Sequence, residues 1–285
     1  MFKNLNLAAI GIRATMLEGL ALAKATGYKG LDPSLKEAGQ LVQEHSTEYV
    51  KALFEEAGIK PGGWFLPVNW RGDDTEYNEQ LAKLPERAKL ASDLGCHRTI
   101  SVVLAWDDSR PFKENWDFHV KRLRPPAEIL KDYGHSLALE FIGPNTSRAP
   151  HKYGFLHTMD AMLALCAAIG TDNVGLLLDA WHCYTAHVTL DDLKKLSKED
   201  VIYVHINDAP AGIDINNQID NARALPGETG VIPLPEILRI LKDIGYDGPI
   251  TPEPFSKKLS EMAPADAART VSELLDKIWR QAGLV

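Results

Sequence analysis

The chain has 285 residues, 45% hydrophobic and 25% charged, which is the composition of an ordinary globular protein and excludes a disordered one. Its formal net charge of −8 disfavours a nucleic-acid partner, because phosphate binding requires clustered Lys and Arg. Three cysteines without CxxC spacing, no long apolar run and no N-terminal signal segment predict a cytoplasmic protein without disulfides or a membrane partner.

Short apolar runs alternate with amphipathic segments along the whole chain. The runs predict strands over Leu5–Ile12, Gly30–Leu35, Gly63–Val68, Arg98–Leu104, Ser136–Phe141, Val174–Asp179, Val201–Ile206 and Pro249–Pro254. The segments between and after them predict helices over Leu17–Thr26, Thr47–Ala57, Glu79–Leu94, Asn115–Asp132, Thr158–Ile169, Leu190–Leu196, Leu234–Ile244 and Ala265–Ala282. The pair Pro125 and Pro126 lies inside the fourth helix and is expected to break or kink it.

This alternation predicts an α/β fold. We interpret residues 1–285 as one domain, a single (β/α)₈ TIM barrel in which helices surround a parallel eight-stranded barrel. An open doubly wound sheet is the competing architecture, but the chain has no GxGxxG or GxxxxGK[ST] motif. The long connections 105–115, 143–156 and 207–231 each follow a strand, and such loops build the active-site face of a barrel.

Four of the later strands end on, or next to, a side chain that can bind a cation, namely Glu140, Asp179, His205 and Glu253. Only a closed ring of strands brings these four ends to one centre. Two glutamates, an aspartate and an imidazole form an oxygen-rich set that suits one divalent ion, with Mn²⁺ preferred and Mg²⁺, Co²⁺ or Zn²⁺ as alternatives. Such an ion would also keep three crowded carboxylates ionised.

These residues and their neighbours resemble the xylose-isomerase-like TIM-barrel superfamily of sugar isomerases and epimerases, which includes ketose 3-epimerases and inosose-processing enzymes. The resemblance covers nearly the whole chain. It rests on Glu140, Asp179-x-x-His182, His205-x-x-Asp208, the Pro-Glu-Pro around Glu253, the opening Gly27-Tyr-Lys-Gly30-Leu-Asp32, and Arg223-x-x-Pro-Gly-Glu-Thr-Gly230.

The resemblance implies a metal-dependent enzyme that isomerises or epimerises a small sugar, sugar phosphate or inosose by proton transfer next to a metal-bound carbonyl. Glu140 and Glu253 would be catalytic as well as metal ligands, and Asp179 and His205 would complete the ligand set. The candidates for substrate binding are His182, Arg223, Asp208 and Trp106. Trp106 is included because an aromatic face suits the C–H face of a sugar.

The main alternative is a lyase or dehydratase on a keto-polyol, because the same enolate can lose a leaving group instead of being reprotonated. An AP-endonuclease-like DNA repair enzyme is less favoured, since it would need three zinc ions and more histidines than the strand ends supply. The segment Phe141–Arg148 lacks the second, substrate-holding glutamate of the epimerases, so the identity of the sugar is left open. A homo-oligomer is compatible with the sequence.

Overall fold

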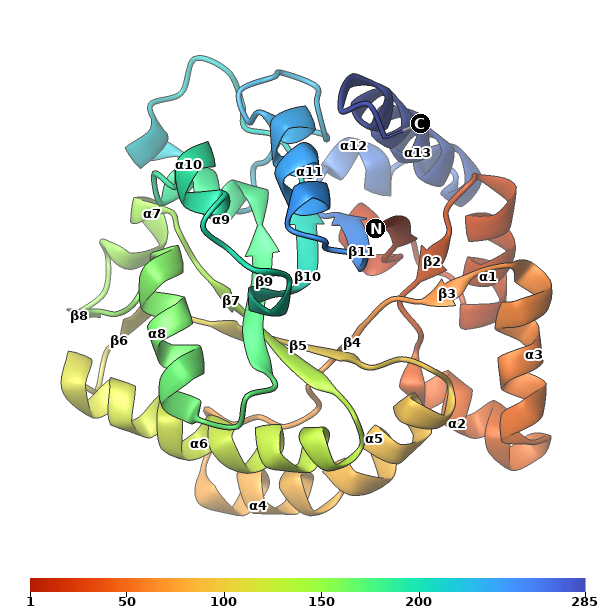
Figure 1. The fold of residues 1–285 in the computed structure, drawn as a ribbon, viewed down its shortest axis with the longest axis horizontal. Helices are drawn as coiled ribbons and strands as arrows, with labels where there is room; N and C mark the ends of the chain where they lie inside the picture. Colours follow the sequence, from red (N-terminus) through yellow and green to blue (C-terminus); the bar gives the residue numbers. More distant parts are fainter. Residues whose placement is uncertain (285) are drawn as a thin grey trace.

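A curled parallel sheet lies at the centre of the computed structural model, which describes residues 1–284, and helices surround it (Figure 1). Every pair of neighbouring strands in this sheet runs parallel, which confirms the predicted TIM-barrel fold. In spatial order the strands are β3 (Lys60–Pro61), β2 (Gly30–Leu31), β1 (Phe2–Leu5), β11 (Pro249–Pro252), β10 (Val201–Ile206), β9 (Val174–Asp179), β7 (Ser136–Phe141), β5 (Arg98–Val103) and β4 (Trp64–Phe65).

The two ends of this sheet, β3 and β4, belong to one segment of chain and are separated only by Gly62 and Gly63. Together they form the third strand of the barrel, with one half bonded to β2 and the other to β5. A Cβ atom at Gly62 would collide with the side chains of Asn4 and Asp32, so only glycine fits at this break. The interrupted strand therefore completes a ring of eight.

The first expected strand, Leu5–Ile12, is displaced. In the structure β1 ends at Leu5 and the chain turns into a 3₁₀ helix over Ala8–Ile10. The cause is local, because the side-chain oxygen of Asn6 accepts a hydrogen bond from the backbone N–H of Ala9 at 3.1 Å. A bond of this kind offers the backbone an alternative to the sheet ladder.

The second and third expected strands are shorter than Gly30–Leu35 and Gly63–Val68. Strand β2 ends at Leu31, and Ser34 then caps a helix that the sequence analysis missed, α2 (Leu35–Glu44), by accepting from the N–H of Glu37 at 3.3 Å. The remaining five strands agree with expectation to within two residues.

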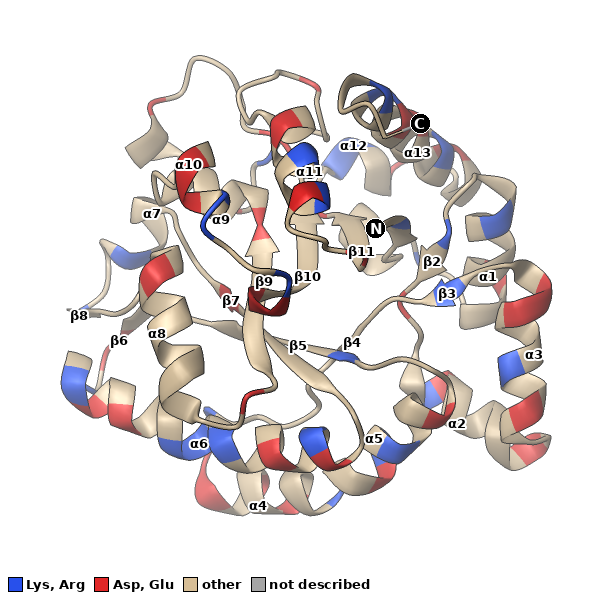
Figure 2. Ribbon diagram, in the orientation of Figure 1, with Lys and Arg blue, Asp and Glu red and all other residues tan. Residues whose placement is uncertain are grey.

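The outer helices carry most of the charged side chains, whereas the central strands carry few (Figure 2). The long helices are α1 (Met16–Ala25), α2, α3 (Thr47–Ala57), α4 (Asp74–Ala82), α5 (Leu84–Asp93), α6 (Phe112–Asp132), α8 (Met159–Ile169), α11 (Leu234–Asp243) and α13 (Pro264–Gln281). The expected helix Glu79–Leu94 is two helices, α4 and α5. Among residues 1–284 no helix is both long and apolar enough to cross a membrane.

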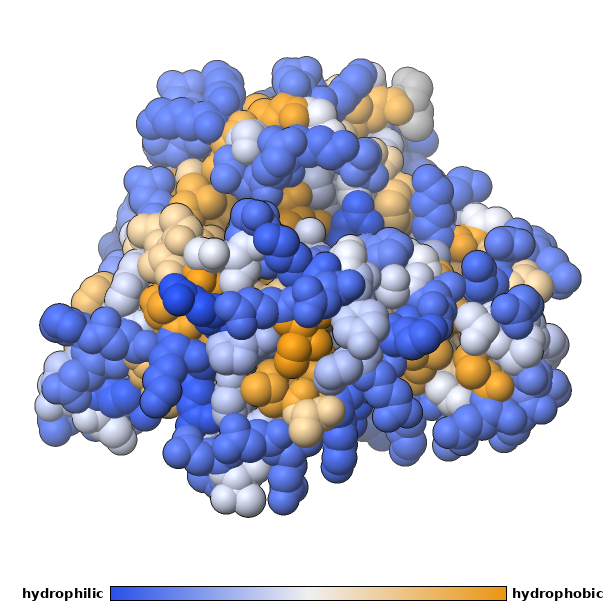
Figure 3. All heavy atoms as spheres, turned by 60° about the horizontal axis from the view of Figure 1, so that its bottom comes forward, coloured by the Kyte–Doolittle hydropathy of each residue, from blue (hydrophilic) through white to orange (hydrophobic). Residues whose placement is uncertain are grey.

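The loops after the strands hold shorter elements: an antiparallel ribbon of β6 (Trp106–Asp107) and β8 (Tyr153–Gly154), and the helices α7 (Asn145–Arg148), α9 (Ala180–Thr185), α10 (Leu190–Leu193) and α12 (Lys257–Ser260). The 3₁₀ helices Lys198–Asp200 and Ile215–Asn217 complete the described elements. The face seen in Figure 3 is largely hydrophilic, with separate apolar patches.

Apolar side chains fill two layers on either side of the sheet. The larger layer lies between strands and helices and includes Leu137 and Leu139 of β7. The smaller layer includes Ala138 from the same strand, together with Ile100, Leu177, Ile202 and Tyr203. Because successive residues of a strand point to opposite faces, Glu140 lies on the same face as Ala138, toward the inside of the barrel.

Helix α6 runs unbroken through Pro125 and Pro126, so the expected break is wrong. A proline at position 126 leaves the carbonyl of Arg122 without its helical N–H partner. The hydroxyl of Tyr77, from α4, donates to that carbonyl at 3.0 Å and replaces the missing bond.

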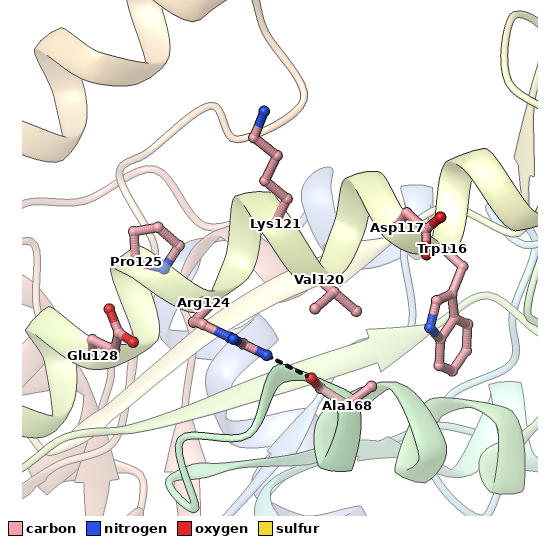
Figure 4. Close-up of a pocket in the computed structure, with 8 residues that line it drawn as sticks. All are labelled: Trp116, Asp117, Val120, Lys121, Arg124, Pro125, Glu128 and Ala168. Carbon is pink, nitrogen blue, oxygen red and sulfur yellow. Dashed lines mark hydrogen bonds between the residues drawn. The ribbon is translucent and has the colours of Figure 1, made fainter.

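Nearby, Arg124 ties α6 to the end of α8 by donating to the carbonyl of Ala168 at 3.1 Å (Figure 4). It also donates to the carbonyl of Ile169 at 2.8 Å. Tertiary contacts thus hold together a helix whose own sequence favours a break.

We expect Tyr77→Phe to lower the free energy of unfolding by about 1–2 kcal/mol, because the Arg122 carbonyl would be left buried without a donor. Urea denaturation followed by circular dichroism measures the change. In a Pro126→Ala background the restored N–H of residue 126 serves the same carbonyl, so the cost of Tyr77→Phe should shrink. An equal cost in both backgrounds would show that the hydroxyl does not replace the helical bond.

Candidate metal centre at the mouth of the barrel

Four side chains converge at the carboxyl ends of four neighbouring strands. Glu140 is contributed by β7, Asp179 is the last residue of β9, His205 lies in β10, and Glu253 directly follows β11. Their ligand atoms all lie within 4.8 Å of one another, so the structure brings together the four residues predicted as ligands. Parallel register explains this, since His205 lies opposite both Asp179 and Thr251 in the sheet.

The imidazole of His205 is the centre of the group. Its Nδ1 atom lies 3.3 Å from Glu140 Oε1, 3.3 Å from Glu253 Oε2 and 3.9 Å from Asp179 Oδ2. Glu140, Asp179 and His205 are buried, whereas Glu253 is partly exposed. One nitrogen and three carboxylates therefore face a common point, which is the arrangement of a possible metal site.

Burial and the charges of neighbouring groups act on the pKa of each residue in the cluster, and the direction of the net shift differs from residue to residue. Burial raises the pKa of Glu140 above its usual value. Burial would lower the pKa of His205, but the carboxylates of Glu253 and Glu140 outweigh it and raise this pKa well above its usual value. Burial would raise the pKa of Asp179 and of Glu253, yet nearby cations, chiefly Arg223 for Asp179 and His205 for Glu253, hold both below their usual values.

Arg223 reaches into the cluster from the long loop 207–231. Its Nη1 atom donates to Asp179 Oδ2 at 2.8 Å and to Glu253 Oε2 at 3.1 Å. Its Nη2 atom donates to Asp220 Oδ1 at 2.6 Å and lies 3.3 Å from Nε2 of His182. The structure thus places both of the substrate-binding candidates Arg223 and His182 beside the four ligands.

His182 lies in α9, one turn after Asp179. Its Nδ1 atom accepts a hydrogen bond from the backbone N–H of Gly143 at 3.2 Å, so in the neutral ring the proton sits on Nε2. Nε2 therefore faces Arg223 as a second donor, and two donors do not bond to each other. The acceptor beside both nitrogens is Asp220 Oδ1, which lies 2.6 Å from Nη2 of Arg223 and 3.9 Å from Nε2 of His182.

Asp208 and Trp106 are placed differently from these two. Trp106 lies in the β6–β8 ribbon, where its ring stacks on that of His151 at 3.4 Å between centroids. Among the described residues neither Asp208 nor Trp106 hydrogen-bonds to a ligand of the cluster, and their contact with a substrate stays a prediction. Asp208 holds its own loop, because its carboxylate accepts from the backbone N–H groups of Ala209, Thr229, Gly230 and Ile232.

A second polar group lies beside the cluster. Asp32, which follows β2, accepts from Asn4 Nδ2 at 2.8 Å, from Asn6 Nδ2 at 2.9 Å and from Tyr203 Oη at 2.7 Å. The Tyr203 ring stands edge-on to the His205 ring, with centroids 5.4 Å apart. The structure thus gives Asp32 a defined role, which is to bind the first, second and seventh strands of the barrel together.

Sequence reasoning missed Asp220 and Phe255. Asp220 precedes Arg223 by three residues in a loop whose conformation no periodic pattern encodes. Phe255 follows the Pro-Glu-Pro around Glu253, and its ring covers the Arg223 guanidinium at 4.6 Å. Only the proximity in the chain of Asp220 to Arg223 and of Phe255 to Glu253 could have drawn attention to them.

Comparisons with known proteins agree with this fold. The family model for the xylose isomerase-like TIM barrel matches residues 20–278. An inosose isomerase of Halalkalibacterium halodurans is 25% identical over 262 residues, which is 91% of this chain and 90% of that protein. The structure of a xylose isomerase domain protein from Alicyclobacillus acidocaldarius has a TM-score of 0.88 and 31% identity, covering 99% of both chains. The crystal structure of the IolI protein with a bound zinc atom has a TM-score of 0.79 and 23% identity, covering 98% of both chains.

We expect the protonated His205 to stabilise the metal-free protein in a pH-dependent way. Since its folded-state pKa lies above the ordinary value of 6.5, the stabilisation is complete below that pH and is lost as the pH rises through the folded-state pKa. In the presence of a chelator, the difference in unfolding free energy between the wild type and His205→Gln should therefore shrink as the pH rises above 6.5.

Urea denaturation across this range measures the difference, and His45→Gln, at an exposed position, is the matched control. A difference that is constant or grows with pH would contradict the raised pKa.

Proposed function

Because the chain belongs to the xylose isomerase-like TIM-barrel family, we propose that it is a metal-dependent isomerase or epimerase of a sugar, sugar phosphate or inosose. The observation that carries the proposal is the convergence of Glu140, Asp179, His205 and Glu253 at the mouth of the barrel. The similarity to an inosose isomerase over nine-tenths of both chains supports the substrate class. A cytoplasmic location, a homo-oligomer and the absence of a nucleic-acid partner are carried forward as predictions.

The residues present fit one divalent ion. Three carboxylates surround a single imidazole nitrogen, and among the described residues their only strong cationic partners are His205 itself and Arg223. Oxygen-rich sets of this kind suit Mn²⁺, with Mg²⁺, Co²⁺ and Zn²⁺ as alternatives. An ion held by these residues would supply a Lewis acid that polarises a substrate carbonyl.

In this proposal Glu140 and Glu253 would move a proton on two sides of a substrate. Strand β7 carries Glu140 and Glu253 follows β11, and the two strands are separated in the sheet by β9 and β10. The two carboxylates therefore come from separate strands, and each lies 3.3 Å from Nδ1 of His205. Without an ion, burial raises the pKa of Glu140, whereas burial of Glu253 is outweighed by His205, which lowers the pKa of Glu253, so the two carboxyls have different environments.

His182 and Arg223 would hold substrate oxygens. Nε2 of His182 and Nη2 of Arg223 lie 3.3 Å apart, and in this proposal a hydroxyl or carbonyl oxygen of a polyol would accept a hydrogen bond from both. The same proton abstraction would begin an elimination, so product analysis must score dehydrated products as well as isomers.

We expect the purified protein to bind about one divalent ion per chain, the stoichiometry of one four-ligand centre. Asp179→Asn combined with His205→Ala should abolish binding, because it removes a charge and a nitrogen ligand. Elemental analysis after gel filtration measures the content. The matched control is Asp191→Asn with His45→Ala, both at exposed positions. Stoichiometric metal in the ligand variant would place the ion elsewhere.

Glu140→Gln and Glu253→Gln should each reduce turnover by about 10²–10⁴-fold, the usual loss when general acid–base catalysis is removed, with a smaller change in metal content. The wild type should exchange the substrate's α-hydrogen with D₂O during turnover, and both variants should suppress this exchange. Nuclear magnetic resonance on a panel of keto sugars and inososes reads both effects. Glu79→Gln, at an exposed position on α4, should behave as wild type.

Turnover with hydrogen transferred inside the substrate and no exchange with solvent would indicate a hydride shift, and the two-glutamate mechanism would then be abandoned.

A further inference from the structure

Negatively charged carboxylates bind the guanidinium of Arg223 on two sides. On one side Nη1 donates to Asp179 and Glu253, at 2.8 Å and 3.1 Å. On the other side Nη2 donates to the Asp220 carboxylate at 2.6 Å and Nε donates to the Asp220 backbone carbonyl at 3.0 Å. Asp220 therefore fixes the plane of the guanidinium so that Nη1 points at the ligand carboxylates.

Asp179 has only one oxygen left to offer a cation. Its Oδ1 atom accepts from the backbone N–H of Trp181 at 2.6 Å and lies 3.5 Å from Asn207 Nδ2. Its Oδ2 atom faces His205 and is the atom that Arg223 binds. An ion at the cluster must share this oxygen with the guanidinium, and both carry positive charge.

Two aromatic rings keep Arg223 in this position. The guanidinium carbon lies 4.6 Å from the centre of the Phe255 ring and 5.6 Å from that of the Trp181 ring. Phe255 has a left-handed backbone, with φ of 46°, which is costly for a residue with a bulky side chain. Strain of this kind persists where the surrounding contacts impose it, and in this conformation the ring lies over Arg223.

We propose that Arg223, clamped by Asp220, is the resident cation of the four-residue cluster and that a divalent ion binds in competition with it. This inference rests on the metal centre proposed above. The guanidinium stabilises the carboxylates before the ion arrives and lowers their affinity for it afterwards. Arg223 therefore sets how tightly the centre holds its ion, in addition to any contact with substrate.

The test is calorimetric titration of Mn²⁺ into protein stripped with chelator, so it needs no turnover. Arg223→Gln should bind Mn²⁺ about tenfold more tightly or better, which is the scale of removing a unit charge a few ångströms from a divalent ion even at the dielectric constant of water. Arg223→Lys keeps the charge and should stay near the wild-type affinity. Arg239→Gln removes an equally charged arginine from an outer, half-exposed position on α11 and should change nothing.

A second variant guards against misfolding. Arg223→Gln combined with Asp220→Asn removes the pair without leaving Asp220 uncompensated, and it should bind Mn²⁺ more tightly than Asp220→Asn alone. Variants that fold only when Mn²⁺ is added would also support the proposal, because the ion would then replace the resident cation. Variants that stay unfolded with Mn²⁺ would overturn it.

The outcomes separate this inference from the function proposed above. A wild type that binds no Mn²⁺ would refute the metal centre itself. A wild type that binds Mn²⁺ while Arg223→Gln binds it equally or more weakly would refute the competition alone and leave the metal centre intact.

Discussion

Three carboxylates crowded around one buried imidazole form the constraint on which the active end of this barrel depends. Like charges at such short range raise one another's pKa values unless cations compensate them. Here His205 and Arg223 supply the compensation, and the backbone N–H of Trp181 adds a further bond to Asp179. The cluster therefore favours the binding of a cation at the mouth of the barrel.

The barrel must close for this cluster to exist, because its members come from four different strands. Closure occurs at the interrupted third strand, where Gly62 lets the chain pass against Asn4 and Asp32. Asp32 in turn binds Tyr203, which lies two residues before His205 on the same strand. The Tyr203 ring stands edge-on to the His205 ring, and both residues lie in β10. The polar group around Asp32 and the candidate metal centre are therefore joined through one strand.

A second set of residues surrounds the ligands, and it comes from loops. Asp208 ties the loop 207–231 to itself through backbone amides, and Thr146 of α7 donates to the carbonyl of Gln218 in that loop at 2.7 Å. These bonds hold the loop in a conformation in which Arg223 reaches Asp179 and Glu253 and Asp220 binds Arg223. The strands place the four candidate ligands, and the loops determine what charge and which hydrogen-bond donors face them.

The sequence by itself determined the strands that carry the ligands, since a strand covered on both faces is a continuous apolar run and a carboxylate or imidazole at its end stands out. Strands β7, β9 and β10 therefore have the expected bounds, and the four ligands meet as predicted. Only the tertiary structure decided the rest. The carbonyl of Arg122, which Pro126 leaves without a helical donor, accepts a hydrogen bond from Tyr77, 45 residues away in the chain. Arg223 binds Asp179, which is 44 residues away in the chain. A local sequence pattern indicates which face of a helix or strand is apolar. The hydrogen-bond partner of a polar group depends on the closed fold, because only the fold brings residues that are distant in the sequence into contact.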